Sequence, residues 1–182
     1  MAVWTHIAHS ALSLPASSVS WTSVSSSYDH LVIKISARNS GTSNYLTEAY
    51  LRVGDGSVDT TASYSATVLK AEGSTTPASE RETSESKVRG IQIGNDSVLG
   101  DTFSAAEVWC MNYSGTVGFK QFVIQGSVEN NSTSTGSPKE WSLYNVAGLW
   151  QSTVAIDEIQ ILTSADNFMA NSTFDLYGIL GV

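Results

Sequence analysis

The stretch LVIKISARNS, residues 31–40, decides the fold class of this 182-residue chain. Apolar side chains recur in it at every second position, polar side chains stand between them, and an Asn-Ser-Gly turn signal ends it. Successive side chains of a β-strand point to opposite faces of the sheet, so this alternation is typical of a strand with one buried face. The apolar face comprises Leu31, Ile33, Ile35 and Ala37.

The same alternation, broken at short intervals by Gly, Asn, Asp and Ser, extends over most of the chain. Few turn residues separate residues 101–115 from residues 116–127, so these two segments are expected to form a β-hairpin. About eight to ten short strands in one modest domain predict an all-β fold, an antiparallel β-sandwich that is jelly-roll-like. Further strands are expected in EAYLRVGDG (48–56), TASYSATVLKAEG (61–73), RGIQI (89–93), WSLYNVAGLWQS (141–152), VAIDEIQILTS (154–164) and STFDLYGILGV (172–182).

Some segments lack the alternation. Residues 75–87 are polar and charged, which predicts a long exposed loop or a disordered arm. Residues 129–140 predict a second loop, and a short helical turn is expected around residues 164–168. Residues 1–16 are apolar in places but too short for a core of their own. We expect them to form an N-terminal arm that packs across the domain or onto a neighbouring subunit, ahead of a single β-sandwich domain at residues 17–182.

Composition excludes several classes of protein. The formal net charge is −8 and the pI is about 4.7, so the basic surface that neutralises phosphates in nucleic-acid-binding proteins is absent. Cys110 is the single cysteine, so an intrachain disulfide cannot form. No apolar run approaches the roughly 18–20 residues of a membrane helix, and we expect no secretory signal. We therefore expect neither nucleic acid nor membrane as a partner.

Recognisable patterns of catalytic and metal-binding residues are missing from the sequence. The histidines His6, His9 and His30 form neither a helical His-x-x-x-His pair nor a Cys-His cluster, so no metal site is predicted. DGSVD at residues 55–59 lacks the glycine and glutamate of a calcium loop and predicts a solvated turn. The apolar neighbours of Cys110 indicate that its thiol lies in or beside the core, which favours a structural role over that of a catalytic nucleophile. We expect no catalytic residue, no cofactor and no metal.

Aromatic side chains are the best candidates for a binding role. Trp109, Phe119 and Trp150 lie within strand patterns, which favours positions in the core. Other tryptophans lie near the ends of strands, where exposure is expected, and exposed Trp anchors protein interfaces or offers a platform for sugars. The candidate partner-binding residues are Trp4, Ile7, Leu12, Leu14, Trp21 and Trp141.

Five segments together carry a pattern shared with a known family. They are SVSWTSVSSSYDHLVIKISAR (18–38), YLRVGDGSVDTTASY (50–64), DTFSAAEVWCMNYSGTVGFKQF (101–122), VAGLWQSTVAIDEIQILTSADNF (146–168) and STFDLYGI (172–179). Residues 148–156 and LYGI at residues 176–179 are the most specific pieces. Through them the chain resembles small structural proteins of tailed, often marine, bacteriophages, whereas the charged insert at residues 75–87 departs from that pattern.

The resemblance implies a jelly-roll module displayed on the virion, without an active site. The leading hypothesis is a capsid decoration or cement protein, made in the host cytoplasm, that binds the major capsid protein or another virion protein. We expect a homo-oligomer, a dimer or trimer, on the capsid surface. The alternative is a tail-fibre or receptor-binding module that recognises host surface carbohydrate. A third class is a glycan-cleaving sandwich enzyme, which would require two carboxylates about 5 to 9.5 Å apart.

Overall fold

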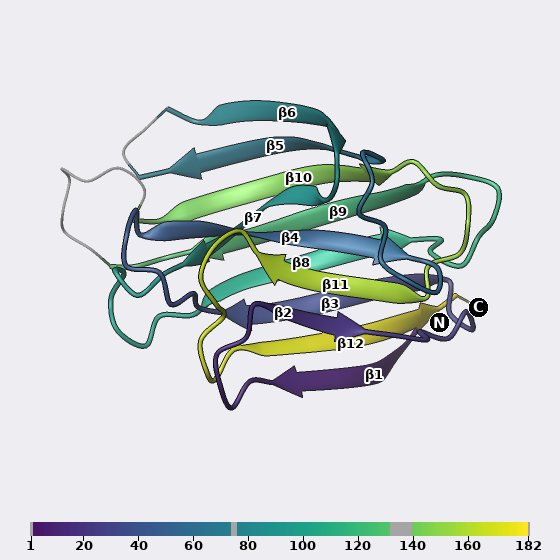
Figure 1. Ribbon diagram of the computed structural model, residues 1–182, viewed down its shortest axis with the longest axis horizontal. Coiled ribbons are helices and arrows are strands. Elements are labelled where there is room, and N and C mark those ends of the chain that lie inside the picture. The colour runs from purple at the N-terminus through teal and green to yellow at the C-terminus, as the bar shows by residue number, and fades with distance from the viewer. Residues whose placement is uncertain (1, 74–75, 132–139, 182) are drawn as a thin grey trace.

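The computed structural model describes residues 2–73, 76–131 and 140–181, and the regular structure of these residues is entirely β-strand. Two antiparallel sheets lie face to face (Figure 1), which confirms the predicted all-β sandwich. No helix that could cross a membrane occurs in these ranges. The strands are β1 (Val3–Ala11), β2 (Ser18–Trp21), β3 (His30–Ala37), β4 (Leu46–Gly54), β5 (Tyr64–Glu72), β6 (Ala78–Glu85), β7 (Val88–Gly94), β8 (Ser104–Met111), β9 (Lys120–Val128), β10 (Ser142–Trp150), β11 (Glu158–Thr163) and β12 (Thr173–Leu180).

The strand order is that of an extended jelly roll. The large sheet has eight strands in the order β1-β12-β3-β8-β9-β10-β5-β6, and the small sheet has four in the order β2-β11-β4-β7. The chain passes repeatedly from one sheet to the other, for example from β2 to β3, from β3 to β4 and from β4 to β5. The meander β8-β9-β10 can be counted as one position and the β5-β6 hairpin as an insertion between β4 and β7. The eight positions that remain then follow the double Greek key of a jelly roll.

Every second side chain along the strands points inward, and these side chains fill the space between the sheets. Leu31 and Ile33 of β3 and Leu51 and Val53 of β4 are each at most 3% exposed. These four side chains line one small internal void of about 10 Å³, so the two sheets interlock at this point. The apolar face predicted for residues 31–40 is therefore the face that packs against the small sheet.

The N-terminal segment, expected to form an arm, is the edge strand β1 of the large sheet (Figure 1). Its antiparallel pairing with β12 runs from Val3 opposite Leu180 to Ala11 opposite Thr173. Hydrogen bonds from Leu12 N to Ser172 O and from Ala16 N to Phe168 O continue the attachment beyond the strand. The domain itself therefore holds this segment in place.

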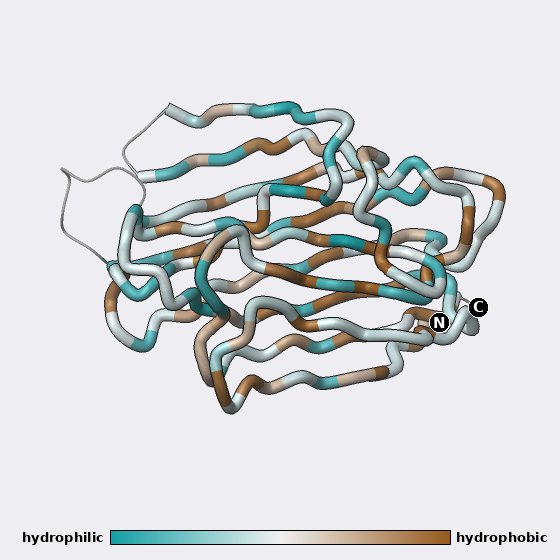
Figure 2. The backbone as a smooth tube through the Cα atoms, in the orientation of Figure 1, coloured by the Kyte–Doolittle hydropathy of each residue, from teal (hydrophilic) through white to brown (hydrophobic). Residues whose placement is uncertain are grey.

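The charged segment at residues 75–87 contains strand β6, so the expectation of a long loop or disordered arm was wrong. β6 is the outermost strand next to β5, and most of its side chains are exposed (Figure 2 shows its largely hydrophilic course). An edge strand is held by backbone hydrogen bonds on one side and buries little, so it needs no apolar alternation. Arg81 opposite Thr67 belongs to this ladder.

Residues 164–168 form bends and an isolated bridge, so the helical turn expected there was also wrong. Phe168 explains the extended backbone, because it forms β-bridges with Ala16 and Asn39. Its ring is buried, and the ring centroid lies 5.0 Å from that of Phe174. Burial of this ring outweighs the local preference for a turn. Within the loop predicted at residues 129–140, residues 132–139 lie outside the described residues.

Candidate functional site

A polar row crosses the outer face of the large sheet, the face that points away from the small sheet. Cross-strand pairing aligns its members, which are His9, Asp175, Lys34, Glu107 and Gln125. Lys34 Nζ lies 2.7 Å from Glu107 Oε1, and Gln125 Nε2 donates a hydrogen bond of 3.3 Å to Glu107 Oε2. Desolvation opposes ionisation of Glu107, but the bonds from Lys34 and Gln125 outweigh it and hold the pKa of this carboxyl below its ordinary value. Glu107 is therefore a fixed negative charge on this face.

Trp4, Trp109 and Tyr177, which we call the aromatic cluster, gather beside the polar row. The Trp4 ring packs in T-shaped geometry against the other two rings. Its centroid lies 5.5 Å from that of Trp109 and 6.0 Å from that of Tyr177. Strand register places Val32 between Tyr177 and Trp109 on the same face, yet Val32 has 0% exposure. The aromatic cluster therefore covers this valine, and the Trp4 side chain remains 46% exposed above it.

Exposed apolar side chains continue from the aromatic cluster across the same face. They are Met111 on β8, Val123 on β9, Leu143 on β10 and Leu69 on β5, each between 43% and 62% exposed. A shallow hollow of about 300 Å³ lies over β8, β9 and β10, with Gln125 and Leu143 in its lining. A broad, shallow and partly apolar face of this kind is suited to contact with another macromolecule.

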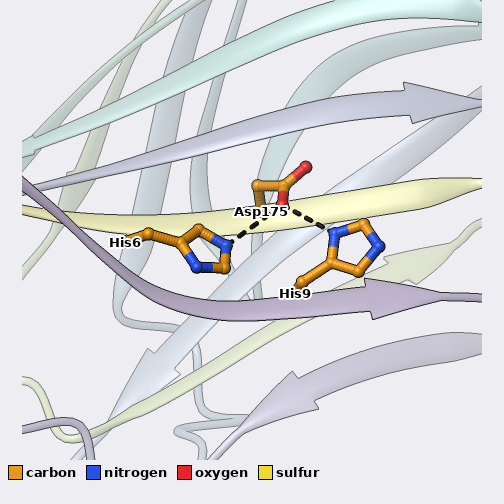
Figure 3. Close-up of side chains that lie close together, drawn as sticks. All are labelled: His6, His9 and Asp175. Atoms are coloured by element: carbon orange, nitrogen blue, oxygen red, sulfur yellow. Dashed lines mark hydrogen bonds and ion pairs between the residues drawn. The ribbon is translucent and has the colours of Figure 1, made fainter.

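His6, His9 and Asp175 form a second cluster, on the edge strand β1 and its neighbour β12 (Figure 3). His6 Nε2 lies 3.2 Å and His9 Nδ1 lies 2.7 Å from the same oxygen, Asp175 Oδ1. The three potential ligand atoms all lie within 4.8 Å of one another. The Tyr177 ring lies 5.2 Å from the His6 ring and supports it from one side. These are the described residues whose side chains could hold a metal ion.

The residues predicted to bind a partner do not form one patch. Trp4 lies in the aromatic cluster, whereas Ile7 and Leu12 are partly buried against the core. Leu14 is 74% exposed in the turn after β1, whereas Trp21 is 8% exposed and lies in the core. Trp141, directly before β10, is 37% exposed. β10 is five strands away from β1 in the large sheet, so Trp141 is remote from Trp4.

The expectation of core positions was right for Trp150 and wrong for Trp109 and Phe119. Trp150 is 3% exposed, Phe119 is 54% exposed, and Trp109 faces outward in the aromatic cluster. The sequence held a signal for Trp109, because Glu107 lies two positions earlier and so shares its face. Tyr177 and Asp175 were missed because nothing in the sequence shows that β12 lies beside β1.

In the predicted turn at residues 55–59, Asp55 is exposed, whereas the Asp59 carboxylate bonds to groups at one end of the core. Asp59 accepts hydrogen bonds from Thr61 N at 2.7 Å, from Ser63 Oγ and from the indole nitrogen of Trp150 at 2.8 Å. An isolated bridge between Gly54 and Val58 closes the turn. Asp59 thereby joins this turn to a buried tryptophan.

Comparison with known proteins adds no family. No family model matches the chain, and no curated protein matches it. One similar solved structure is a fructofuranosidase variant from Schwanniomyces occidentalis complexed with fructosylnystose, with 8% identity and a TM-score of 0.22. The match covers 96% of this chain and spans about a third (33%) of that one. A TM-score this low does not indicate a shared fold, so this likeness carries no argument about function.

Proposed function

We propose that this chain is a virion structural protein of a tailed bacteriophage, most simply a capsid decoration or cement protein. Its proposed partner is the major capsid protein or another virion protein, and its proposed location is the capsid surface. The proposal rests on the resemblance of the sequence to such proteins and on the outer face of the large sheet. It involves no turnover of a substrate.

Exposed apolar side chains across one sheet face are the observation that carries the proposal. Trp4, Met111, Val123 and Leu143 are large apolar side chains exposed on the same face. Contiguous apolar surface on a soluble domain marks an interaction site, and tryptophan is enriched among the residues that dominate interface energy. The Lys34–Glu107 ion pair within this face would add orientation to the contact.

Display on a shell makes a modest interface sufficient. Many copies bind to a repeating lattice, and linked copies within a dimer or trimer raise the effective concentration of each binding face. We therefore propose a homo-oligomer as the binding unit. Its size is measurable by light scattering of the purified protein.

A second candidate is a tail-fibre or receptor-binding module that recognises host surface carbohydrate. The observation that favours it is the half-exposed indole of Trp4, which has Lys34 Nζ 5.7 Å from its ring centroid. An exposed aromatic ring beside charged side chains offers an apolar surface and polar anchors to one ligand.

Immunoelectron microscopy of purified virions tests the placement. Label over the whole shell supports decoration, whereas label confined to the tail, together with binding on a glycan array, supports the second candidate. Release of reducing sugar from a glycan by the purified protein would contradict both.

A binding assay with shells stripped of the protein tests the proposed face. Loss of an aromatic residue that anchors an interface costs about 2 kcal/mol or more, so W4A should bind about thirtyfold more weakly. The control is L99A, because Leu99 is 59% exposed but lies in the loop between β7 and β8. Equal binding by W4A and the native protein would show that another surface is used.

A further inference from the structure

We propose that His6, His9 and Asp175 form a binding site for a divalent transition metal ion, with Zn²⁺ as the ion that fits best. Two imidazoles and one carboxylate are a donor set that Zn²⁺ accepts, and such three-ligand sites leave a further position to water. Ca²⁺ and Mg²⁺ prefer sites built from oxygen alone, so the two histidines select against them.

The carboxylate oxygen lies about as far from each imidazole nitrogen as two ligands of one metal ion lie from each other. Four ligands at about 2.0–2.1 Å from tetrahedral zinc lie about 3.3 Å from one another. In the structure His6 Nε2 and His9 Nδ1 lie 3.2 and 2.7 Å from Asp175 Oδ1, and both rings turn these nitrogens toward that oxygen (Figure 3). All three ligand atoms lie within 4.8 Å of one another, so the two exposed imidazoles need only draw together for a metal ion to replace the two hydrogen bonds and take the same atoms as its ligands.

A β-bulge explains why two histidines three positions apart share one face. In a regular strand, side chains at positions i and i+3 point to opposite faces. The register of β1 against β12 shifts between His6 and Ala8, which leaves Ile7 as the extra residue. His6 therefore lies opposite Tyr177 while His9 lies opposite Asp175. Since residues 175 and 177 point to the same face of β12, both imidazoles meet the carboxylate.

The position of the cluster indicates what the metal would do. His6 and His9 belong to the edge strand β1, and Asp175 belongs to its neighbour β12. A metal ion bound by all three would tie the N-terminal strand to the sheet. The histidine side chains are 48% and 49% exposed, so an ion would reach them directly from solvent. A metal ion that binds the folded chain but not the unfolded chain would also raise the free energy of unfolding.

Isothermal titration of the chelator-treated chain with ZnCl₂ tests the site. We expect one Zn²⁺ per chain, a rise in the melting temperature with ZnCl₂, and greater protection of the β1 amides from hydrogen exchange. Loss of an outer-shell partner already lowers metal affinity about 10- to 100-fold, so H6A, H9A and D175N should each lower it about tenfold or more. Co²⁺ substituted for Zn²⁺ should give visible absorption bands typical of tetrahedral coordination.

The third histidine supplies the control. His30 lies on β3, where its Nδ1 accepts a hydrogen bond from Asn112 N, and it is not part of the cluster. H30A should bind Zn²⁺ as the native chain does. Circular dichroism separates loss of a ligand from loss of the fold, and D175N preserves side-chain volume. Absence of Zn²⁺ binding by the native chain, or equal binding by H6A, H9A and D175N, would overturn the proposal.

Discussion

The indole of Trp4 meets the indole of Trp109 at an interplanar angle of 89°, with ring centroids 5.5 Å apart. Aromatic pairs in this geometry contribute about 0.5–1.5 kcal/mol beyond the area that they bury. We expect a double-mutant cycle of W4A and W109A to show a coupling of this size, because either substitution alone already removes the contact. Urea unfolding followed by far-ultraviolet circular dichroism measures it.

A cycle of W4A with W141A is the matched control. Trp141 precedes β10, five strands from β1, and sites more than about 10 Å apart contribute additively to stability. Additive effects of W4A and W109A would mean that their contact contributes nothing to folding.

The alternation in residues 31–40 predicted both the fold class and the buried face, because period-two burial is a local property of a strand. The aromatic cluster could be predicted only in part. The strand pattern around Trp109 was interpreted as a core position, although Glu107 on the same face was a signal for exposure. No local pattern shows that Trp4 reaches Trp109 from another strand. In a regular strand the His6–His9 spacing would place the two side chains on opposite faces, and the bulge opposite β12 brings them to the same face. Bulges and strand order are set by pairing between distant segments, which one sequence does not reveal.

Asp59 makes stability depend on acid pH. Desolvation opposes its ionisation, but hydrogen bonds from Ser63, Thr61 and Trp150 outweigh it and hold the pKa of this carboxyl well below its ordinary range. Unfolded Asp has a pKa of about 3.9, so the contribution of Asp59 is fully present above about pH 5 and is lost as the pH falls toward the lower, folded pKa. We expect D59N to lose about 1–3 kcal/mol of unfolding free energy at pH 7.

The difference between D59N and the native chain should shrink progressively below about pH 4, which urea unfolding at several pH values measures. D55N is the control, because Asp55 is an exposed residue of the same turn. Its effect should stay within about 0.5 kcal/mol at each pH. A pH-independent loss in D59N would mean that the carboxylate charge is not what the turn requires.

Cys110 should be inert to thiol reagents in the folded chain. Burial raises the pKa of its thiol to about 12, and the residue is 6% exposed. The thiolate is the reactive form, so both access and ionisation oppose the reaction. We expect Ellman's reagent to find no reactive thiol in native buffer and one per chain in concentrated guanidinium chloride. Rapid stoichiometric labelling of the native chain would place Cys110 at the surface and contradict its burial between the sheets.

Gly178, in the LYGI segment, lies beneath the ring of Tyr28. A Cβ at this position would lie 2.3 Å from Tyr28 Cγ, so any larger residue must displace the ring. Overpacking of this kind costs about 1–3 kcal/mol, and we expect G178A to lose that amount of unfolding free energy in urea. G118A is the control, because a Cβ at Gly118 would meet nothing within 4 Å.

Removal of the Tyr28 ring should relieve the overlap at Gly178. Y28A alone loses the packing of the ring, but G178A should then cost little more in that background, so the double variant should be more stable than the sum of the two losses predicts. Strict additivity would mean that the glycine is required by its strand for another reason. Non-additivity would instead give a physical reason for the glycine in one of the most specific segments of the chain, since only a residue without a side chain lets Tyr28 cover β12 at this point.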